Sequence, residues 1–167
     1  MQKQEQEKQF ENTIRQNELL IWKVCRIYAY TNADRKDLFQ EIVIQLWNAY
    51  PHFKGNAAIT TWLYRVAINT AITRLRKEKH FITSYEPAAL PTTVSDETTH
   101  QIAEEQLQQL YAAIELLNQV ERAIVLLYME DTPYAEMEEI LGINQGHIRV
   151  KMNRIKKKLR ELTNNNC

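Results

Sequence analysis

Apolar residues recur at steps of three and four along most of the chain, which is the period of an α-helix with one buried face. In the N-terminal half this pattern predicts a helix ending near Tyr30, a second ending at Pro51 and, after a loop, a third ending near Lys79. In the C-terminal half helices resume at about Gln101, break at Asn118 and continue as a short helix and a final pair. The pattern therefore predicts an all-α protein.

The final pair of helices carries strong local stop and start signals. Thr132 can cap a helix whose first residue is Pro133, where the missing N–H costs nothing. Gly142 provides a left-handed stop, and Asn144 can cap the next helix. A helix stop, a short link and a helix start predict a helix-turn-helix motif.

Charge distinguishes these two helices from each other. Residues 130–141 contain five acids and no Lys or Arg, whereas residues 142–160 contain seven Lys or Arg and no acid. On the second helix we expect a buried stripe of Ile148, Met152, Ile155, Leu159 and Leu162, and an outer face of Arg149, Asn153, Arg154 and Lys157. A basic outer face on the second helix fits the major groove of DNA, and the alternative is an ordinary solvated basic helix.

A second candidate nucleic-acid surface is the loop at residues 51–60 with the helix that follows it. The aromatic residues Phe53, Trp62 and Tyr64 surround a loop that carries Lys54, and the next helix ends in a basic cluster. Aromatic faces with nearby cations favour single-stranded nucleic acid. Two structural alternatives stay open, because Trp62 can be a core residue and cations suit any helix C-terminus.

The segment 80–101 breaks the helical pattern, since it contains Pro87, Pro91 and a polar run with little periodicity. A stretch of this length without periodicity predicts two domains joined by a flexible linker rather than one compact fold. We therefore expect a domain at 1–79, a linker at 80–101 and a helix-turn-helix domain at 102–162.

Composition excludes several other classes of protein. The formal net charge is zero, so affinity for nucleic acid must come from local patches. The chain has no apolar run long enough to span a membrane, its start does not read as a signal peptide, and Cys25 and Cys167 have no ligand-like spacing. Glycine-rich phosphate loops, metalloprotease motifs and nucleophile elbows do not occur in the sequence. We expect a cytoplasmic protein with no catalytic residues, no metal and no cofactor.

Two segments together resemble one family. Residues 37–77, DLFQEIVIQLWNAYPHFKGNAAITTWLYRVAINTAITRLRK, resemble region 2 of extracytoplasmic-function (ECF) sigma factors, and residues 118–162, NQVERAIVLLYMEDTPYAEMEEILGINQGHIRVKMNRIKKKLREL, resemble their region 4. The order and the linker between them also match. The resemblance implies two helical domains, no catalytic activity and a role as the promoter-recognising subunit of bacterial RNA polymerase.

The resemblance also implies which residues of region 2 contact partners. The helix from Asp37 to Trp47 looks like the surface that docks on the clamp coiled coil of the largest polymerase subunit, through Asp37, Gln40, Glu41, Leu46 and Trp47. The loop looks like the part that captures a flipped base of the minus-10 element, and the helix after it would hold the non-template strand. The implied minus-10 residues are Lys54, Gly55, Asn56, Ala57, Ala58, Ile59, Thr60, Thr61, Arg65, Asn69, Arg74 and Arg76.

Region 4 would read the minus-35 element and also contact the polymerase flap. The implied DNA-contacting residues are Gln145, His147, Arg149, Val150, Lys151, Asn153, Arg154 and Lys157. The linker would thread into polymerase. Since the chain has no sensing domain, control must come from outside, with an anti-sigma factor as the expected partner of a free monomer.

Three rival functions differ in what they leave unexplained. A stand-alone helix-turn-helix regulator accounts for the C-terminal half but leaves the aromatic loop and the docking helix without a role. An adaptor that binds polymerase without reading DNA does not account for the basic recognition helix. For the third rival, an enzyme, the sequence offers no catalytic motif. The acidic pairs Glu104–Glu105 and Glu138–Glu139 do not form one, because adjacent residues on a helix point in different directions.

Overall fold

The computed structural model describes residues 1–55, 57–82 and 101–164, and within these ranges all regular structure is helical. The helices are α1 (Gln2–Gln16), α2 (Glu18–Tyr28), α3 (Asn32–Ala49), the 3-10 turn η1 (Tyr50–His52), α4 (Ile59–Ile82), α5 (Gln101–Glu115), α6 (Gln119–Met129), α7 (Tyr134–Leu141) and α8 (Gln145–Asn164). The prediction of an all-α protein is confirmed. Asn56 and most of the expected linker lie outside the described residues, although α4 continues three residues beyond the boundary expected at residue 79.

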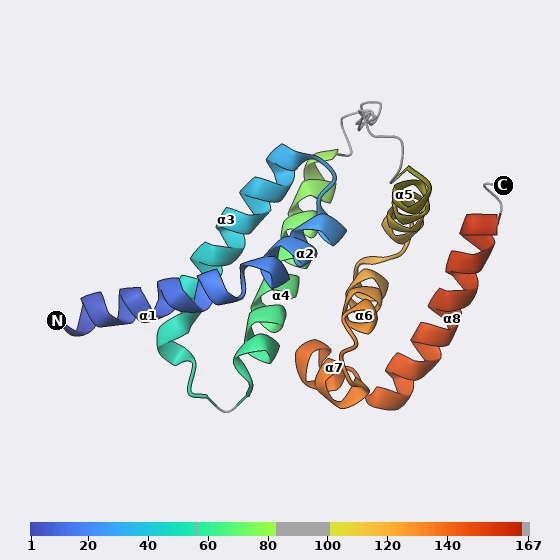
Figure 1. Cartoon of the computed structure of the whole chain (residues 1–167). Helices are drawn as coiled ribbons and strands as arrows, with labels where there is room; N and C mark the ends of the chain where they lie inside the picture. The colour runs from blue at the N-terminus through green and yellow to red at the C-terminus, as the bar shows by residue number, and fades with distance from the viewer. Residues whose placement is uncertain (56, 83–100, 165–167) are drawn as a thin grey trace.

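The N-terminal unit is a three-helix packing of α2, α3 and α4, from which α1 projects to one side (Figure 1). The single helix expected up to Tyr30 is wrong, because the chain breaks at Asn17 into α1 and α2. The Asn17 side chain donates a hydrogen bond to the Thr13 carbonyl at 2.9 Å, and such local bonds compete with helix continuation. Phe10 holds the end of α1 on the bundle, with its ring edge-on to Trp47 and Tyr50 at centroid distances of 5.0 and 5.2 Å.

The C-terminal unit contains α5 to α8, and its last two helices form the expected helix-turn-helix. Gly142 ends α7 in the left-handed conformation, with a φ of 69°, as the sequence predicts. The start of α7 differs, since Pro133 occupies the N-cap position and Thr132 lies before it. The Oδ1 atom of Asn144 accepts a hydrogen bond from the Gly146 N–H at 2.8 Å and so satisfies one free donor at the start of α8.

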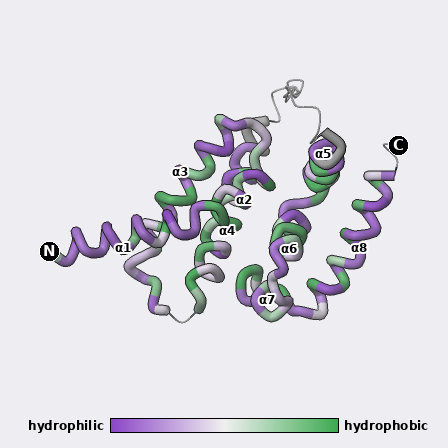
Figure 2. Tube along the Cα trace, in the orientation of Figure 1, coloured by the Kyte–Doolittle hydropathy of each residue, from purple (hydrophilic) through white to green (hydrophobic). Residues whose placement is uncertain are grey.

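The two units share one continuous apolar core. Figure 2 shows hydrophobic positions along the facing sides of the helices and hydrophilic positions along α1 and the outer side of α8. In addition, α7 packs against α4, while α5 and α6 pack against α2. Among the described residues, no helix is both long and apolar enough to cross a membrane.

Candidate functional site

The recognition helix α8 presents one polar face while its apolar stripe is buried. Ile148, Met152 and Ile155 are at most 3% exposed, so they fix the helix on the core. The residues predicted to contact the minus-35 element lie on the other side, where Gln145 is half-buried and the rest are exposed: His147, Arg149, Val150, Lys151, Asn153, Arg154 and Lys157. The structure therefore brings all eight onto one accessible helix.

Helix α7 supports one of these side chains directly. The guanidinium carbon of Arg149 lies 5.1 Å from the centroid of the Tyr134 ring, within the range of a cation–π contact. This contact limits the conformations of Arg149 before any DNA is bound. The sequence offered no signal for this role of Tyr134 beyond its place at the start of α7.

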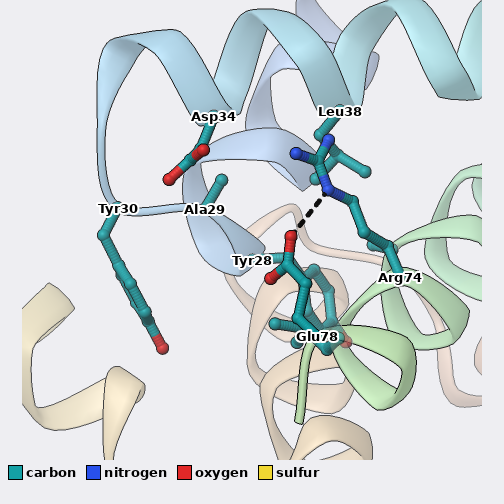
Figure 3. A pocket seen from close by; sticks show the side chains of 9 residues that line it. Tyr28, Ala29, Tyr30, Asp34, Leu38, Arg74 and Glu78 are labelled. Carbon is teal, nitrogen blue, oxygen red and sulfur yellow. Dashed lines mark hydrogen bonds and ion pairs between the residues drawn. The ribbon is translucent and has the colours of Figure 1, made fainter. Parts of the chain in front are cut away.

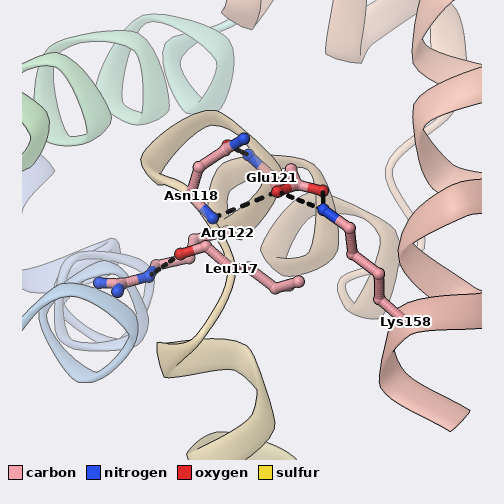
Figure 4. Close-up of polar contacts among 5 residues, drawn as sticks. All are labelled: Leu117, Asn118, Glu121, Arg122 and Lys158. Atoms are coloured by element: carbon pink, nitrogen blue, oxygen red, sulfur yellow. Dashed lines mark hydrogen bonds and ion pairs between the residues drawn. The ribbon is translucent and has the colours of Figure 1, made fainter. Parts of the chain in front are cut away.

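The far end of α8 is tied to α6 by a buried carboxylate. Glu121 and Asn118 form a reciprocal capping box, and Lys158 of α8 donates to both Glu121 oxygens at 3.3 and 3.0 Å (Figure 4). Arg122 closes the preceding turn by donating to the Leu117 carbonyl at 3.1 Å. These contacts fix the angle between the recognition helix and the rest of its unit.

The loop between α3 and α4 is exposed at Lys54 and Gly55, and Gly55 has a φ of 73°, which favours glycine. Phe53 stacks at a tilt against Trp62, with 4.9 Å between ring centroids, and both rings are half-buried.

Two expectations fail here. Thr61 is only 2% exposed, and Tyr64 is buried at 9% exposure, so neither side chain can contact DNA in this structure. Asn56, the centre of the proposed base-capture loop, lies outside the described residues.

The basic residues of α4 differ in how free they are. Asn69 and Arg76 are exposed. Arg74, by contrast, is engaged inside the N-terminal unit. Its Nε atom lies 3.1 Å from a carboxylate oxygen of Glu78 (Figure 3). Its Nη1 atom lies 3.9 Å from a carboxylate oxygen of Glu41. Its side chain is only 19% exposed, so we interpret it as a structural cation rather than a phosphate ligand.

The prediction for α3, the helix expected to dock on polymerase, needs one correction. Leu46 is 0% exposed and belongs to the core, so it is not available to polymerase. The apolar residue on the outer face is instead Ile44, which is 57% exposed and follows Gln40 by four residues and Asp37 by seven. Helical spacing from Asp37 could have identified Ile44, because a face containing 37 and 40 also contains 44.

The remaining predicted docking residues are accessible to different degrees. Asp37 and Gln40 are exposed, and Glu41 and Trp47 are half-buried. Trp47 is partly covered by Phe10 of α1, and Glu41 lines an open groove of about 340 Å³ between α3 and α4. The accessible centre of the face is therefore Asp37, Gln40 and Ile44.

Cavities and titratable groups in the described parts do not point to small-molecule chemistry. The cavity in Figure 3, between the ends of α2, α3 and α4, has a volume of about 40 Å³, far below the several hundred Å³ typical of ligand pockets. The groove beside Glu41 is larger, at about 340 Å³, but it is an open surface groove rather than an enclosed pocket. The described residues contain no cluster of three or more His, Cys, Asp or Glu that could hold a metal ion. The surfaces described above, rather than a pocket, are the candidate site.

Comparison with known proteins gives the same division of the chain. The family model described as Sigma-70 region 2 matches residues 13–81, and the model described as Sigma-70, region 4 matches residues 107–159. The ECF RNA polymerase sigma factor SigM of Mycobacterium tuberculosis (strain H37Rv) is 24% identical over 153 residues, covering 92% of this chain and 76% of the relative. The ECF RNA polymerase sigma factor SigW of Bacillus subtilis (strain 168) is 27% identical over 159 residues, covering 85% and 84%.

Two solved structures share the fold over nearly the whole chain. The sigma factor RpoE, in complex with the anti-sigma factor NepR from Bartonella quintana, has a TM-score of 0.72 at 18% identity, covering 93% of this chain and 96% of that one. CnrH, in complex with the cytosolic domain of CnrY, has a TM-score of 0.69 at 14% identity, covering 96% and 91%.

Proposed function

The chain belongs to the ECF family of RNA polymerase sigma factors, and we propose that it docks on core polymerase through α3, reads promoter DNA through α4 and α8, and catalyses no reaction itself. One observation carries the assignment of surfaces: an accessible docking face on α3 and an accessible basic face on α8 occur in the same chain. We call the residues Asp37, Gln40 and Ile44 the docking face. The proposed place of action is the cytoplasm, with RNA polymerase.

The docking face has the composition of a small protein-binding site. Ile44 offers an apolar anchor, and Asp37 and Gln40 provide a polar rim around it. We propose that this face meets the clamp coiled coil and that region 4 meets the flap. A free-standing regulator has no need of such a face.

For DNA, we propose that Arg149, Val150, Asn153 and Arg154 read the minus-35 element in the major groove. Arginine and asparagine make bidentate contacts to base edges, and the exposed Val150 offers an apolar contact to a thymine methyl group. In region 2 the accessible candidates for the minus-10 element are Lys54, Gly55, Ala58, Thr60, Arg65, Asn69 and Arg76. One lysine and two arginines here supply the charge needed to hold a single strand.

We further propose an anti-sigma protein as the regulatory partner. The support is that both solved relatives described above were determined with a bound protein, and that the RpoE structure names its partner as an anti-sigma factor. The described residues contain no separate sensing unit, since the helices form only the two units.

The experiment that tests this function is binding to core polymerase. We expect wild-type protein to co-purify with core polymerase and to direct transcription from specific promoters, whereas the double variant Asp37→Ala, Ile44→Ala loses both. Removing a partly desolvated charge at an interface costs about 2–5 kcal/mol of binding free energy. Glu41 is left unchanged, because its carboxylate lies near Arg74 and its loss would disturb the fold as well.

The matched control is Leu116→Ala with Glu105→Ala, which also removes one exposed apolar and one exposed acidic side chain. Exposed truncations of this kind cost within about 0.5 kcal/mol of stability, so both double variants are expected to stay folded. Equal binding by the two double variants would remove the docking face from the interface. A wild-type protein that fails to bind core polymerase while binding a palindromic site would favour the stand-alone regulator.

A further inference from the structure

Aromatic side chains form a continuous series of ring contacts from α1 to the loop between α3 and α4. The Phe10 ring of α1 lies edge-on to Tyr50 of η1, with 5.2 Å between the ring centroids. Tyr50 is tilted against Trp62 of α4 at 6.2 Å, and Trp62 against Phe53 at 4.9 Å. Ring pairs at centroid distances of about 4.5–7 Å stabilise a fold beyond the area that they bury. Phe53 directly precedes Lys54, so these contacts end at the loop proposed for the minus-10 element.

Phe10 anchors α1 to this series of rings. It is buried at 8% exposure, whereas its two neighbours in sequence are exposed. Its ring also lies edge-on to Trp47, near the end of α3, with 5.0 Å between the ring centroids. Residues 2–9 of α1 extend beyond this contact and project from the N-terminal unit (Figure 1). The contact between α1 and η1 therefore depends on one aromatic side chain.

The direction of α1 is fixed by its last turn. The Asn17 side chain donates to the Thr13 carbonyl at 2.9 Å, and the Asn17 backbone N–H lies 3.2 Å from the carbonyl oxygens of both Thr13 and Ile14. These bonds satisfy carbonyl groups at the end of the helix that lack a partner within it. Ile14, one turn after Phe10, is half-buried and packs on the core. Helix α1 is thus held at two places, and Phe10 is the one that reaches the rings near the loop.

The ring contacts join the two ends of the loop. On one side the Phe53 N–H donates to the Tyr50 carbonyl at 3.1 Å and closes η1. On the other side the Trp62 N–H donates to the Ala58 carbonyl at 3.2 Å in the first turn of α4. The Trp62 ring contacts both Tyr50 and Phe53, while residues 54–55 stay exposed. A change at Tyr50 can therefore alter the loop without touching an exposed loop residue.

We propose that Phe10 is a positioning residue for this loop. Its ring holds Tyr50 and, through Tyr50 and Trp62, keeps the loop in the conformation that captures a base of the minus-10 element. Phe10 itself does not touch DNA; it lowers the cost of ordering the loop when DNA binds. The placement of the loop rests on the contacts above, and its effect on promoter opening rests on the proposed function.

A nitroxide spin label on residue 54 of the full chain tests the placement without polymerase or DNA. The label is attached through Lys54→Cys in a chain that also carries Cys167→Ser, while Cys25 stays because it is 0% exposed and cannot be labelled in the folded chain. Electron paramagnetic resonance then gives the ratio of mobile to immobile label. We expect Phe10→Ala to raise this ratio roughly twofold to tenfold, the equilibrium factor that corresponds to one lost ring pair.

Two further variants separate the ring from general loss of packing. Phe10→Leu keeps an apolar side chain but no ring, and we expect it to raise the ratio as well. Ile14→Ala shortens a half-buried side chain of the same helix outside the ring contacts and should keep the wild-type ratio. Circular dichroism verifies that each variant keeps its helices. A wild-type ratio in folded Phe10→Leu, or an equal rise in Ile14→Ala, would overturn the positioning role.

The effect on promoter opening is measured with unlabelled chains that carry the native Lys54. Preformed complexes with core polymerase are used, because Phe10 also contacts Trp47 and docking must not limit the rate. Permanganate reactivity of the minus-10 thymines should show opening slowed roughly twofold to tenfold in Phe10→Leu, relative to both wild type and Ile14→Ala. A mobile loop with a wild-type opening rate would overturn the effect on opening. A wild-type chain that opens no promoter would instead reject the proposed function, and the spin-label result would still decide whether Phe10 positions the loop.

Discussion

Lys158 Nζ lies 3.0 Å from Glu121 Oε2, and this ion pair joins the recognition helix α8 to the first turn of α6. The same Glu121 accepts a hydrogen bond from the Asn118 backbone N–H at 3.2 Å, while Asn118 Oδ1 accepts one from the Glu121 N–H at 2.8 Å. One carboxylate thus caps a buried helix and positions α8, the helix proposed to read DNA. The stability of α6 and the orientation of α8 are therefore coupled through one side chain.

We expect Glu121→Ala to lower the free energy of unfolding by about 2–3 kcal/mol. About 1 kcal/mol comes from the lost cap, and the remainder from the ion pair and from the packing of a side chain that is only 10% exposed. Lys158→Ala should cost less than about 1 kcal/mol, because the lysine side chain is 54% exposed and can be solvated when unpaired. Urea denaturation measures both.

The control for this pair is Lys157→Ala, which removes an exposed neighbouring lysine with no carboxylate contact among those described. We expect a change within about 0.5 kcal/mol. If the Glu121 and Lys157 variants were equally stable, the capping box and the ion pair would contribute nothing measurable.

In the recognition helix, we expect Arg149→Ala and Arg154→Ala each to weaken promoter use while leaving the melting temperature near that of the wild type. A bidentate contact to a base is worth about 1–3 kcal/mol, or roughly a fivefold to 150-fold change in affinity. In vitro transcription from a minus-35-dependent promoter measures this. Arg160→Ala, an exposed arginine near the end of α8, is the control.

The two arginines should differ in one respect. Arg149 is held over the Tyr134 ring, so Tyr134→Leu should reproduce part of the Arg149→Ala defect by freeing the guanidinium. Arg154 makes no such contact among those described, and its role should not depend on Tyr134. Normal transcription by both arginine variants would remove them from base reading.

Local signals of the sequence predicted most of the helices, because they act within one turn. The left-handed stop at Gly142 and the cap at Asn144 are formed as expected, since each depends only on nearby backbone. The predicted single helix up to Tyr30 was wrong because of another local contact. The break at Asn17 depends on a hydrogen bond from its side chain to the backbone, which the amphipathic pattern of the sequence does not reveal.

The roles of individual side chains were harder to predict where they depend on burial in the folded structure. Leu46 and Ile44 are both aliphatic and two residues apart. Helical spacing from Asp37 places Ile44 on the outer face, and the packing of α3 on α2 and α4 shows that Leu46 is core and Ile44 is exposed. Tyr64 looked like a stacking residue but is buried in the folded structure. The contacts between the two units, such as Arg65 with Glu139, join residues far apart in sequence, and no periodicity encodes them.

Three buried proton-bearing groups at the centre of the molecule predict how stability changes at alkaline pH. Burial raises the pKa of Cys25 from 9.0 to about 12 and that of Tyr64 from 10.0 to about 12, and it also raises the pKa of Tyr28. The unfolded chain therefore loses these protons at lower pH than the folded chain. Below about pH 8 both states keep them, so the groups contribute no pH dependence there.

Above pH 9 the unfolded chain binds fewer protons, so the free energy of unfolding must fall as pH rises toward 12. We expect urea denaturation at pH 8, 9, 10 and 11 to show a flat region followed by this decline. Tyr28→Phe removes one titrating group and should reduce the slope by up to about 1.4 kcal/mol per pH unit. It also removes the donor to the Gln119 carbonyl, so it lowers stability at pH 8 as well.

Val24→Ala is the control, because it destabilises the same core without removing a proton and should keep the wild-type slope. A Tyr28→Phe variant with the same slope as Val24→Ala would show that Tyr28 titrates alike in both states.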